Sequence, residues 1–435
     1  MSLFGAIPLL ASASGMQGFH FSTLVYSREV GRISVWGTAW AVLAMECADV
    51  SAVDSGLKSC PRILFLVTED WYFLLHWIGL ARATRDAGFE VLLAMRVHEH
   101  GQEISQEGFK LFPIRLLRRS LNPIRESIAI LELARLYRSQ KPDIVYHVGL
   151  KPILYGSVAA RLADIPHVIN VFAGLGYAFT SEGIKARLFR LFLGCGLKAA
   201  FMCARSIAVF QNEEDRTQLT QDRIVQKNQT RVIRGMGVDT DRFKPVVDKD
   251  REPIVLLACR MLWDKGVGEF VEAARLLSRR KLNARFVLAG RCDQDNPASI
   301  RPKQLHQWQE EGVIEWWGHR NDMPTVLGEA AFVVLPSYRE GLPVSLLEAA
   351  ACGKAIIATD VPGCREVVRH RVNGLLVPPR DAVALADAVA MLLENEELRH
   401  ALGHRGREIV VKEFSATAVT GQTLALYREL LHSSS

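Results

Sequence analysis

The sequence lacks several patterns that would assign it to a familiar class. Its 435 residues include eight cysteines but no C-x-x-C pair, which argues against a zinc ribbon and fits a reducing compartment. It contains no run of 18 apolar residues, so no transmembrane helix is predicted. The Gly-x-Gly pairs at 174–176 and 235–237 are incomplete dinucleotide fingerprints, which makes a dehydrogenase an unfavourable interpretation. The length and ordinary composition indicate a globular protein of about two or three domains.

Positive charge is concentrated in the middle of the chain. The net charges of residues 1–60, 61–240 and 241–435 are −1, +7 and 0, which together give the +6 of the whole chain. Such an excess suits an anionic partner, such as a phospholipid surface, a phosphorylated substrate or nucleic acid. A solvated basic surface without a specific partner would give the same distribution.

One basic segment is also apolar. Residues 183–204, together with Arg115, Arg118 and Arg119, have the composition of a region that contacts an anionic membrane surface. The alternative is an ordinary core helix with a basic rim.

Short apolar runs alternate with helical patterns from residue 61 onwards. Strands are predicted at 62–67, 90–94, 143–147, 167–171, 254–259, 285–289, 331–335 and 355–358. Helices are predicted at 72–87, 123–139, 153–162 and 266–280. This alternation is typical of βαβ units. The sequence therefore predicts an α/β protein with two doubly wound, Rossmann-like domains that face each other across a cleft.

The predicted domain boundaries follow changes in this pattern. Residues 1–60 show no clear periodicity and are expected to form a poorly ordered N-terminal extension. The first Rossmann-like domain is predicted to span 61–245 and the second 246–412. A C-terminal helix at 413–431 is expected to pack back on the first domain.

One segment of the second domain combines an anion site with two carboxylates. A loop carries Glu340 and Gly341, and a helix that begins near Pro343 places Glu348 in an apolar setting. The glycine lets backbone N–H groups approach a ligand, and the helix N-terminus favours an anion. The alternative is a buried helix whose glutamate, Glu348, meets an arginine.

Two cations follow the first strand of the second domain. Arg260 closes the strand, and Lys265 stands just before the helix that begins at Gly266. Arginine binds phosphate through two parallel hydrogen bonds, and lysine adds a point charge. In isolation, such a pair is more often a pair of surface residues than a ligand site.

Taken together, these segments resemble the family-4 glycosyltransferases of the GT-B fold. The matching pieces are Glu340-x7-Glu348, Arg260-x4-Lys265-Gly266, and the segments 318–324, 359–363 and 373–378. The resemblance covers about residues 61–431. It implies that the donor-binding residues are Arg260, Lys265, Glu340, Gly341, Leu342, Pro343 and Glu348.

The resemblance also implies roles for these side chains. Glu348 would hold the ribose hydroxyls of a nucleotide-sugar donor, and Glu340 would contact the transferred sugar. Arg260 and Lys265 would neutralise the donor diphosphate. The implied reaction is hexosyl transfer with retention, without a cofactor or a catalytic metal. The sequence 239–241 looks like a metal-binding Asp-x-Asp, but its position at the entry to a linker argues against that role.

The N-terminal half looks like a narrower group that adds a sugar to a polyprenyl-diphosphate-linked acceptor. The similar segments are 146–152 and 172–179. Many relatives carry His-x-His where this chain has His147 followed by Val148. His147 is therefore a candidate for catalysis, with a satisfied strand-end histidine as the alternative.

The partners implied are a nucleotide-sugar donor, a lipid-linked saccharide acceptor and an anionic membrane surface, without nucleic acid. The expected setting is surface polysaccharide assembly, as in lipopolysaccharide or exopolysaccharide synthesis. The enzyme would be cytoplasmic and peripheral on the inner face of the cell membrane.

Other functions remain open at this point. A sugar-nucleotide epimerase shares the architecture, a soluble glycosyltransferase would use a non-lipid acceptor, and a binding protein would keep only the donor pocket. A glycosidase is disfavoured because its two carboxylates lie roughly 5–9.5 Å apart. Eight residues of helix would separate Glu340 from Glu348 by roughly 12 Å.

Overall fold

The computed structural model describes residues 60–117, 122–173, 184–202, 206–246, 252–293 and 296–433, without the side chains of residues 184–192. The chain divides into the units Met1–Ser55 and Gly56–Ser435, and all described residues belong to the second. The predicted N-terminal extension, apart from Cys60, lies outside the described residues. So do Arg118 and Arg119 of the predicted basic region.

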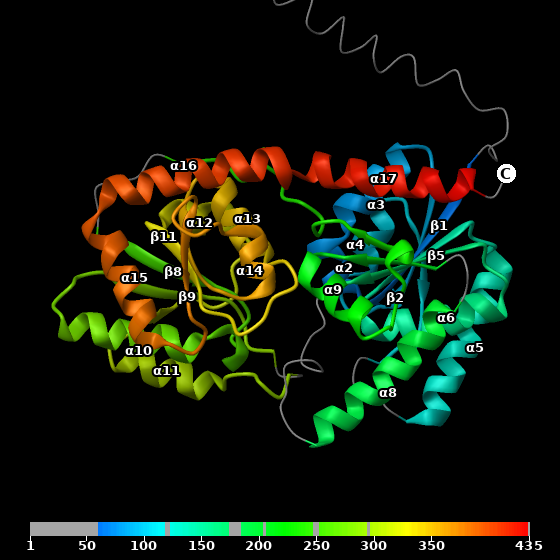
Figure 1. Ribbon diagram of the computed structural model, residues 1–435, viewed down its shortest axis with the longest axis horizontal. Helices are drawn as coiled ribbons and strands as arrows, with labels where there is room; N and C mark the ends of the chain where they lie inside the picture. Colours follow the sequence, from blue (N-terminus) through cyan, green and yellow to red (C-terminus); the bar gives the residue numbers. More distant parts are fainter. Residues whose placement is uncertain are drawn as a thin grey trace, which may run out of the picture. The chain divides into compact units, whose positions relative to one another are not determined.

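Among the described residues, seven parallel strands form the first sheet, in the order β3-β2-β1-β4-β5-β6-β7. Figure 1 labels β1, β2 and β5 of this sheet. They are β1 (Arg62–Glu69), β2 (Glu90–Arg96), β3 (Lys110–Pro113), β4 (Ile144–Val148), β5 (His167–Phe172), β6 (Ser206–Phe210) and β7 (Thr230–Val232). In the central strand β1, Ile63, Phe65 and Val67 pack into one core cluster. Leu64 and Leu66 pack into a second cluster on the opposite face. A parallel strand covered on both faces needs a continuous apolar run, which explains why this run predicted a strand.

Helices connect these strands. They are α2 (Asp70–His76), α3 (Ile78–Asp86), α4 (Gly101–Gln106), α5 (Pro123–Gln140), α6 (Leu150–Leu162), α8 (Ile184–Phe201) and α9 (Glu213–Gln221), with the 3-10 turn η1 (Lys227–Gln229). The helix predicted at 72–87 is interrupted at Trp77, whose backbone leaves the helical region between α2 and α3. Trp77 is buried against the sheet, so core packing takes precedence over helix continuity there.

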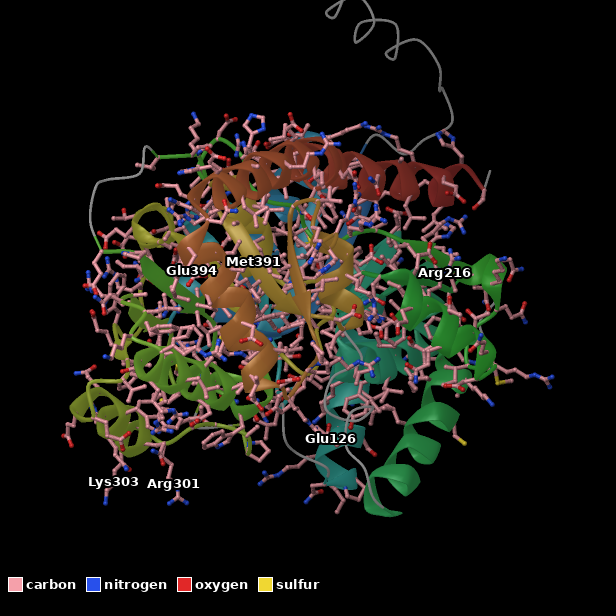
Figure 2. The ribbon with its side chains drawn as sticks, turned by 60° about the vertical axis from the view of Figure 1, so that its left-hand side comes forward. Glu126, Arg216, Arg301, Lys303, Met391 and Glu394 are labelled. Atoms are coloured by element: carbon pink, nitrogen blue, oxygen red, sulfur yellow. The ribbon has the colours of Figure 1, made fainter. Side chains whose placement is uncertain are left out.

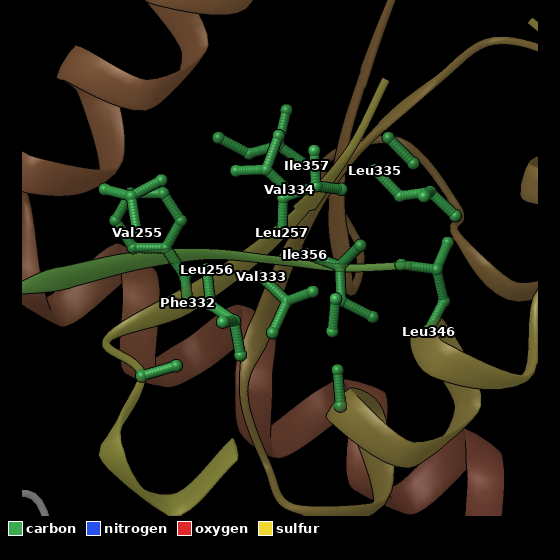
Figure 3. Packing of buried hydrophobic residues seen from close by; sticks show 14 of the residues in the cluster. Val255, Leu256, Leu257, Phe332, Val333, Val334, Leu335, Leu346, Ile356 and Ile357 are labelled. Atoms are coloured by element: carbon green, nitrogen blue, oxygen red, sulfur yellow. The ribbon is translucent and has the colours of Figure 1, made fainter. Parts of the chain in front are cut away.

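In the described ranges, the second sheet has six parallel strands in the order β10-β9-β8-β11-β12-β13. They are β8 (Ile254–Ala258), β9 (Arg285–Ala289), β10 (Glu315–Trp316), β11 (Phe332–Leu335), β12 (Ala355–Thr359) and β13 (Gly374–Val377). Figure 3 shows the apolar side chains of β8, β11 and β12 gathered into one core with Leu346. Both sheets are parallel and carry helices between successive strands, so the predicted α/β class with doubly wound sheets is confirmed.

The elements around the second sheet are mostly helices. They are η2 (Trp263–Lys265), α10 (Val267–Arg279), α11 (Pro302–Glu310), α12 (Met323–Glu329), α13 (Val344–Ala351), α14 (Pro362–Val367), α15 (Ala382–Glu394) and α16 (Glu396–Glu413), and α17 (Ala416–His432) follows them in the chain. None of the helices in the described ranges has the length and hydropathy needed to cross a bilayer.

The last helix, α17, packs against the first sheet. Its Tyr427 ring lies edge-on to those of Phe89 and Tyr146, with 5.9 Å between the ring centroids in each pair. Val419, Leu426 and Tyr427 belong to the same core cluster as β1 and β2. The C-terminal residues of the chain thus complete the hydrophobic core of its N-terminal half.

Candidate functional site

Lys265 and Glu340 meet at the carboxyl end of the second sheet. Lys265 ends η2 after β8, and Glu340 lies in the loop after the neighbouring strand β11. The Nζ of Lys265 is 2.5 Å from Oε1 of Glu340. The two side chains are 20% and 10% exposed, so the ion pair is largely shielded from water but still reachable. The structure therefore brings together two residues that are 75 positions apart in the sequence.

Hydrogen bonds hold the loop after β8 and the loop after β11 together. The N–H of Tyr338 donates to the carbonyl of Asp264 at 2.9 Å, and the Ser337 hydroxyl donates to the same oxygen at 3.2 Å. The Tyr338 hydroxyl donates to Glu269 at 2.6 Å, which ties the β11 loop to α10. The residues beside Lys265 and Glu340 are thus held in place before any ligand binds.

Arg260 lies on the same edge of the sheet, directly after β8. Its Nη1 donates to Oδ2 of Asp293 at 2.8 Å. Burial and the nearby charge of Arg260 together lower the pKa of His76 in α2 to about 4. In the same region, Arg291 stacks over the ring of Trp71 at 5.0 Å from the centroid. Residues of α2, the helix that follows β1, therefore lie near the cations that follow β8 and β9.

The sequence reasoning missed Asp293 and Arg291. Both follow β9 within a few residues, so their place after a predicted strand was the available signal. Neither Asp293 nor Arg291 belongs to a recognised motif. Their partners, Arg260 and Trp71, are distant in the sequence.

The loop around Gly341 offers free backbone donors. In the described part of the chain, the N–H groups of Gly341 and Leu342 donate no hydrogen bond. Pro343 follows as the N-cap of α13. Unpaired N–H groups before a helix N-terminus suit an anionic ligand. These groups lie next to Glu340 in the chain and so beside the Lys265 ion pair.

Glu348 lies in α13, two turns beyond this loop, on a helix whose neighbouring residues are buried against the sheet. Burial raises the pKa of Glu348 to about 7, and the positive charge of Arg242 opposes this rise only in part. A half-buried carboxyl group of this kind can both accept and donate hydrogen bonds near neutral pH.

The raised pKa of Glu348 predicts a pH-dependent loss of stability. The ordinary pKa is 4.5, so between pH 4.5 and about 7 the unfolded chain loses a proton that the folded chain keeps. Stability should therefore fall as the pH rises through this window, and the cost should persist above it. We expect Glu348→Gln to be stabilised relative to wild type by on the order of 2–3 kcal/mol at pH 8, and hardly at pH 4.

Denaturant unfolding at both pH values measures this difference. The control is Glu394→Gln, at an exposed position of α15 that is labelled in Figure 2. This surface substitution should change stability by less than about 0.5 kcal/mol at either pH. A stability difference for Glu348→Gln that does not vary with pH would contradict the raised pKa of this carboxyl group.

His147 does not join this group of residues. Its ring is fully buried between β4 and the helices α5 and α6. Nδ1 is 2.8 Å from Oδ1 of Asn170, and Nε2 is 3.1 Å from the Tyr137 hydroxyl. Burial lowers the pKa of His147 to about 4. With both nitrogens occupied, the geometry fits the alternative of a satisfied core histidine, and we propose no acid–base role for it.

No group of three or more potential metal ligands occurs among the described residues. Asp239, the first residue of the Asp-x-Asp sequence, accepts hydrogen bonds from the N–H groups of Asp241 and Arg242 at 2.9 Å each. This arrangement stabilises a turn.

The chemistry that this edge of the sheet supports is the binding of a polar anion. Arg260 and Lys265 provide positive charge, and the loop at Gly341 provides free N–H donors. Glu340 and Glu348 can accept hydrogen bonds from hydroxyl groups. A ligand with a diphosphate and sugar hydroxyls would satisfy all of these groups.

Comparison with known proteins agrees with this chemistry. The family described as "Glycosyl transferases group 1" matches residues 238–409, and "Glycosyl transferase 4-like" matches residues 62–209. The chain is 30% identical over 365 residues to the N,N'-diacetylbacillosaminyl-diphospho-undecaprenol alpha-1,3-N-acetylgalactosaminyltransferase of Campylobacter jejuni, covering 81% of this chain and 94% of that relative. It is 24% identical to a UDP-Gal:alpha-D-GlcNAc-diphosphoundecaprenol alpha-1,3-galactosyltransferase of Escherichia coli, covering 75% and 85%.

Solved structures show the same fold. Sucrose-phosphate synthase from Thermosynechococcus elongatus matches with a TM-score of 0.72 at 20% identity, covering 86% of this chain and 100% of that one. Anabaena HepE in complex with UDP-glucose matches with a TM-score of 0.69 at 19% identity, covering 85% and 99%. The predicted GT-B architecture is confirmed.

Proposed function

The chain belongs to the group 1 glycosyl transferases, and on this premise we propose that it moves a sugar from a nucleotide-diphosphate sugar to a polyprenyl-diphosphate-linked glycan. The observation that carries the donor half of the proposal is the Lys265–Glu340 pair with Arg260 on the same edge of the sheet. The acceptor half is supported by the printed names of the Campylobacter jejuni and Escherichia coli relatives, both of which act on diphospho-undecaprenol-linked sugars. The product would serve surface polysaccharide assembly.

We assign the two substrates to different halves of the chain. Residues 246–412 form the donor-binding domain in this proposal. Residues 61–245, with the C-terminal helix at 413–431, form the acceptor-binding domain. The packing of Tyr427 against Phe89 and Tyr146 supports grouping that helix with the first half.

In the proposed donor complex, Arg260 and Lys265 bind the diphosphate, whose negative charge grows as the bond to the sugar breaks. Cations already in position stabilise that charge without reorganising. The N–H groups of Gly341 and Leu342 add hydrogen bonds to phosphate or sugar. Glu348 accepts hydrogen bonds from the ribose hydroxyls, and its half-buried place in α13 suits a ligand group that replaces water.

Glu340 contacts the transferred sugar in this proposal. As the bond from the anomeric carbon to the diphosphate oxygen breaks, the acceptor hydroxyl forms a bond on the same face of the sugar. A leaving phosphate oxygen takes the proton of that hydroxyl, so no second carboxylate is needed near the anomeric carbon. Retention of configuration follows from attack on the face that the diphosphate leaves.

Transfer of radiolabel tests the proposal. The protein is incubated with a panel of labelled nucleotide sugars and a polyprenyl-diphosphate-sugar acceptor, and the label is followed into the organic phase. We expect one donor to label the lipid. Label that reaches only water-soluble glycans would favour a non-lipid acceptor, and an epimerised nucleotide sugar without transfer would favour an epimerase.

We also propose that the first half rests on the anionic inner face of the cell membrane. The helix α8 covers most of the predicted basic segment 183–204, and its side chains up to residue 192 lie outside the described residues. Support comes from α5, whose outer face exposes Ile124, Ile128 and Leu131 at 71%, 53% and 49%. These residues recur at helical spacing, and Arg125 and Arg135 on the same helix are exposed as well. An apolar stripe with basic neighbours suits an anionic bilayer.

Liposome binding tests this surface. The protein should bind anionic liposomes at low salt and detach as the salt concentration rises, because each basic residue contributes about 1 kcal/mol that salt screens. Replacing Ile124, Ile128 and Leu131 by serine should weaken binding at least tenfold, since each buried apolar side chain contributes roughly 1.5–3 kcal/mol.

The matched control replaces Val383 and Met391, which are exposed on α15 in the second half, by serine. Met391 is labelled in Figure 2. These changes should leave liposome binding unaltered, and the α5 variant should keep its turnover on a short-chain, water-soluble acceptor. Equal binding by wild type and the α5 variant would contradict the role of α5.

A further inference from the structure

The loop that carries Glu340 is fastened on both sides of this residue to the first half of the chain. On one side, Nη2 of Arg339 donates to Oδ1 of Asp215 at 2.7 Å. On the other, Nδ2 of Asn212 donates to the carbonyl of Gly341 at 2.9 Å. Asn212 and Asp215 stand at the start of α9, just after β6. A residue proposed to touch the transferred sugar is thus bracketed by contacts with the acceptor half.

Asn212 and Asp215 are buried and hydrogen-bond to each other, which fixes both side chains for these contacts. Asn212 is 0% exposed and Asp215 is 2% exposed. Oδ1 of Asn212 accepts the N–H of Asp215 at 2.7 Å, which caps the first turn of α9. Nδ2 of Asn212 also donates to Oδ2 of Asp215 at 3.1 Å. Each side chain therefore holds the other in the conformation that reaches the Glu340 loop.

Two glycines let the chain pack closely around the same loop. A Cβ atom on Gly235, just beyond β7, would lie 2.8 Å from Cδ2 of Leu342. A Cβ atom on Gly363 in α14 would lie 2.6 Å from the carbonyl oxygens of Glu340 and Gly341. The loop is therefore enclosed by the first half on one side and by α14 on the other.

We propose that Asp215 and Asn212 are positioning residues that set Glu340 against the transferred sugar, so that the acceptor half completes the reactive geometry of the donor site. The proposal rests on the function proposed above, and on Glu340 as the residue at the sugar. Arg260 and Lys265 belong to the loop after β8, and in the described residues α9 contacts the Glu340 loop rather than these two cations. Loss of the α9 contacts should therefore displace Glu340 and slow the reaction step, while the two cations still bind the diphosphate.

The choice of variants follows from burial. Nε of Arg339 is buried and has no hydrogen-bond partner among the described residues. Its guanidinium group depends on Asp215, with the Gln218 side chain farther away at 3.4 Å. Removing only one partner leaves a buried charge behind, which destabilises the protein. The isosteric change Asp215→Asn, the change Arg339→Gln and the double variant separate this cost from the positioning role.

The experiment compares kcat, the donor KM and the unfolding temperature of these variants. Each single variant should lose on the order of ten- to a hundredfold in kcat, because small misplacements of a reacting group carry costs of that size. The donor KM should stay within about twofold, since Arg260 and Lys265 still bind the diphosphate. The double variant should be no slower than the slower single variant, because both changes break one contact. Arg339→Lys, which keeps the charge, should recover part of the kcat.

The matched control is Glu214→Gln. Glu214 also lies on α9 and pairs with Arg365 of α14 at 2.8 Å, but this pair is exposed and includes no residue of the Glu340 loop. Its loss should leave kcat unchanged. It tests whether any broken contact of α9 is enough to slow the reaction.

Each outcome decides the proposal. A lower unfolding temperature with wild-type kcat would assign Asp215 and Arg339 to stability alone and overturn it. A raised donor KM with unchanged kcat would assign them to donor binding and overturn it as well. If the wild-type protein transfers no sugar from any nucleotide donor, the proposed function fails first, and the positioning role fails with it.

Discussion

Replacing Lys265 by alanine should lower turnover of the nucleotide sugar by on the order of 100-fold, and Arg260→Ala should have an effect of similar size. Both cations stand at the carboxyl end of β8, and Lys265 is held 2.5 Å from Glu340. A cation fixed before the reaction stabilises the leaving diphosphate at no cost in reorganisation, so its loss raises the barrier. Steady-state kinetics with the donor found by the labelling screen measures the effect.

The variants also remove partners from Glu340 and Asp293, so folding must be followed alongside turnover. Unfolding temperatures and donor binding by calorimetry separate a misfolded protein from one that has lost its phosphate contacts. The control is Lys303→Ala, an exposed lysine on α11 that is labelled in Figure 2 and lies in the same half of the chain. It should keep wild-type activity.

The same prediction includes the effect of chelation. Turnover should persist in excess chelator, because the side chains of Arg260 and Lys265 supply the positive charge at the diphosphate. Complete loss in chelator, restored by manganese or magnesium, would contradict the proposed donor site. Near-wild-type turnover in both alanine variants would show that the diphosphate binds elsewhere.

The strands that the sequence predicted well are those buried on both faces. Continuous apolar runs such as 63–67 and 254–259 suit strands that are covered on both faces, so they mark central strands of parallel sheets. Edge strands carry a weaker signal. Thr230–Val232 and Glu315–Trp316 are short and partly polar, and each is the outermost strand of its sheet, paired on one side only. Periodicity could not distinguish them from loops.

The candidate site also contains residues that the sequence predicted and contacts that it did not. Arg260, Lys265 and Glu340 were predicted because each follows a predicted strand, where the ends of parallel strands share one edge, and because their segments resemble the family-4 glycosyltransferases. The contacts that fix the Glu340 loop were not found, since Asn212 and Gly341 are 129 positions apart and neither belongs to a recognised motif. For His147, the sequence predicted the position of the residue but not the direction of its side chain. Its position at a strand end was correct, but only the structure shows that its ring faces the core rather than the edge.

Gly266 completes the Arg260-x4-Lys265-Gly266 motif, and its replacement should have a large effect on stability. Its φ is +72°, and a Cβ atom there would lie 2.1 Å from the carbonyl oxygen of Pro336. Because of this close approach, the loop after β8 can follow its path only if residue 266 has no side chain. That path places Lys265 beside Glu340. We expect Gly266→Ala to cost on the order of 3–5 kcal/mol in the free energy of unfolding.

Gly312→Ala separates the two causes of this cost. Gly312 has nearly the same φ, +71°, but no atom lies within 4 Å of the position its Cβ would take. Its replacement should therefore cost only the backbone strain, about 1–2 kcal/mol. Denaturant unfolding of both variants measures the difference, which is the cost of the contact with Pro336. If the two variants lose equal stability, this close approach does not constrain the loop, and the motif glycine must be explained by its backbone conformation alone. If Gly266→Ala instead folds and loses donor affinity, the glycine acts by holding Lys265 against Glu340.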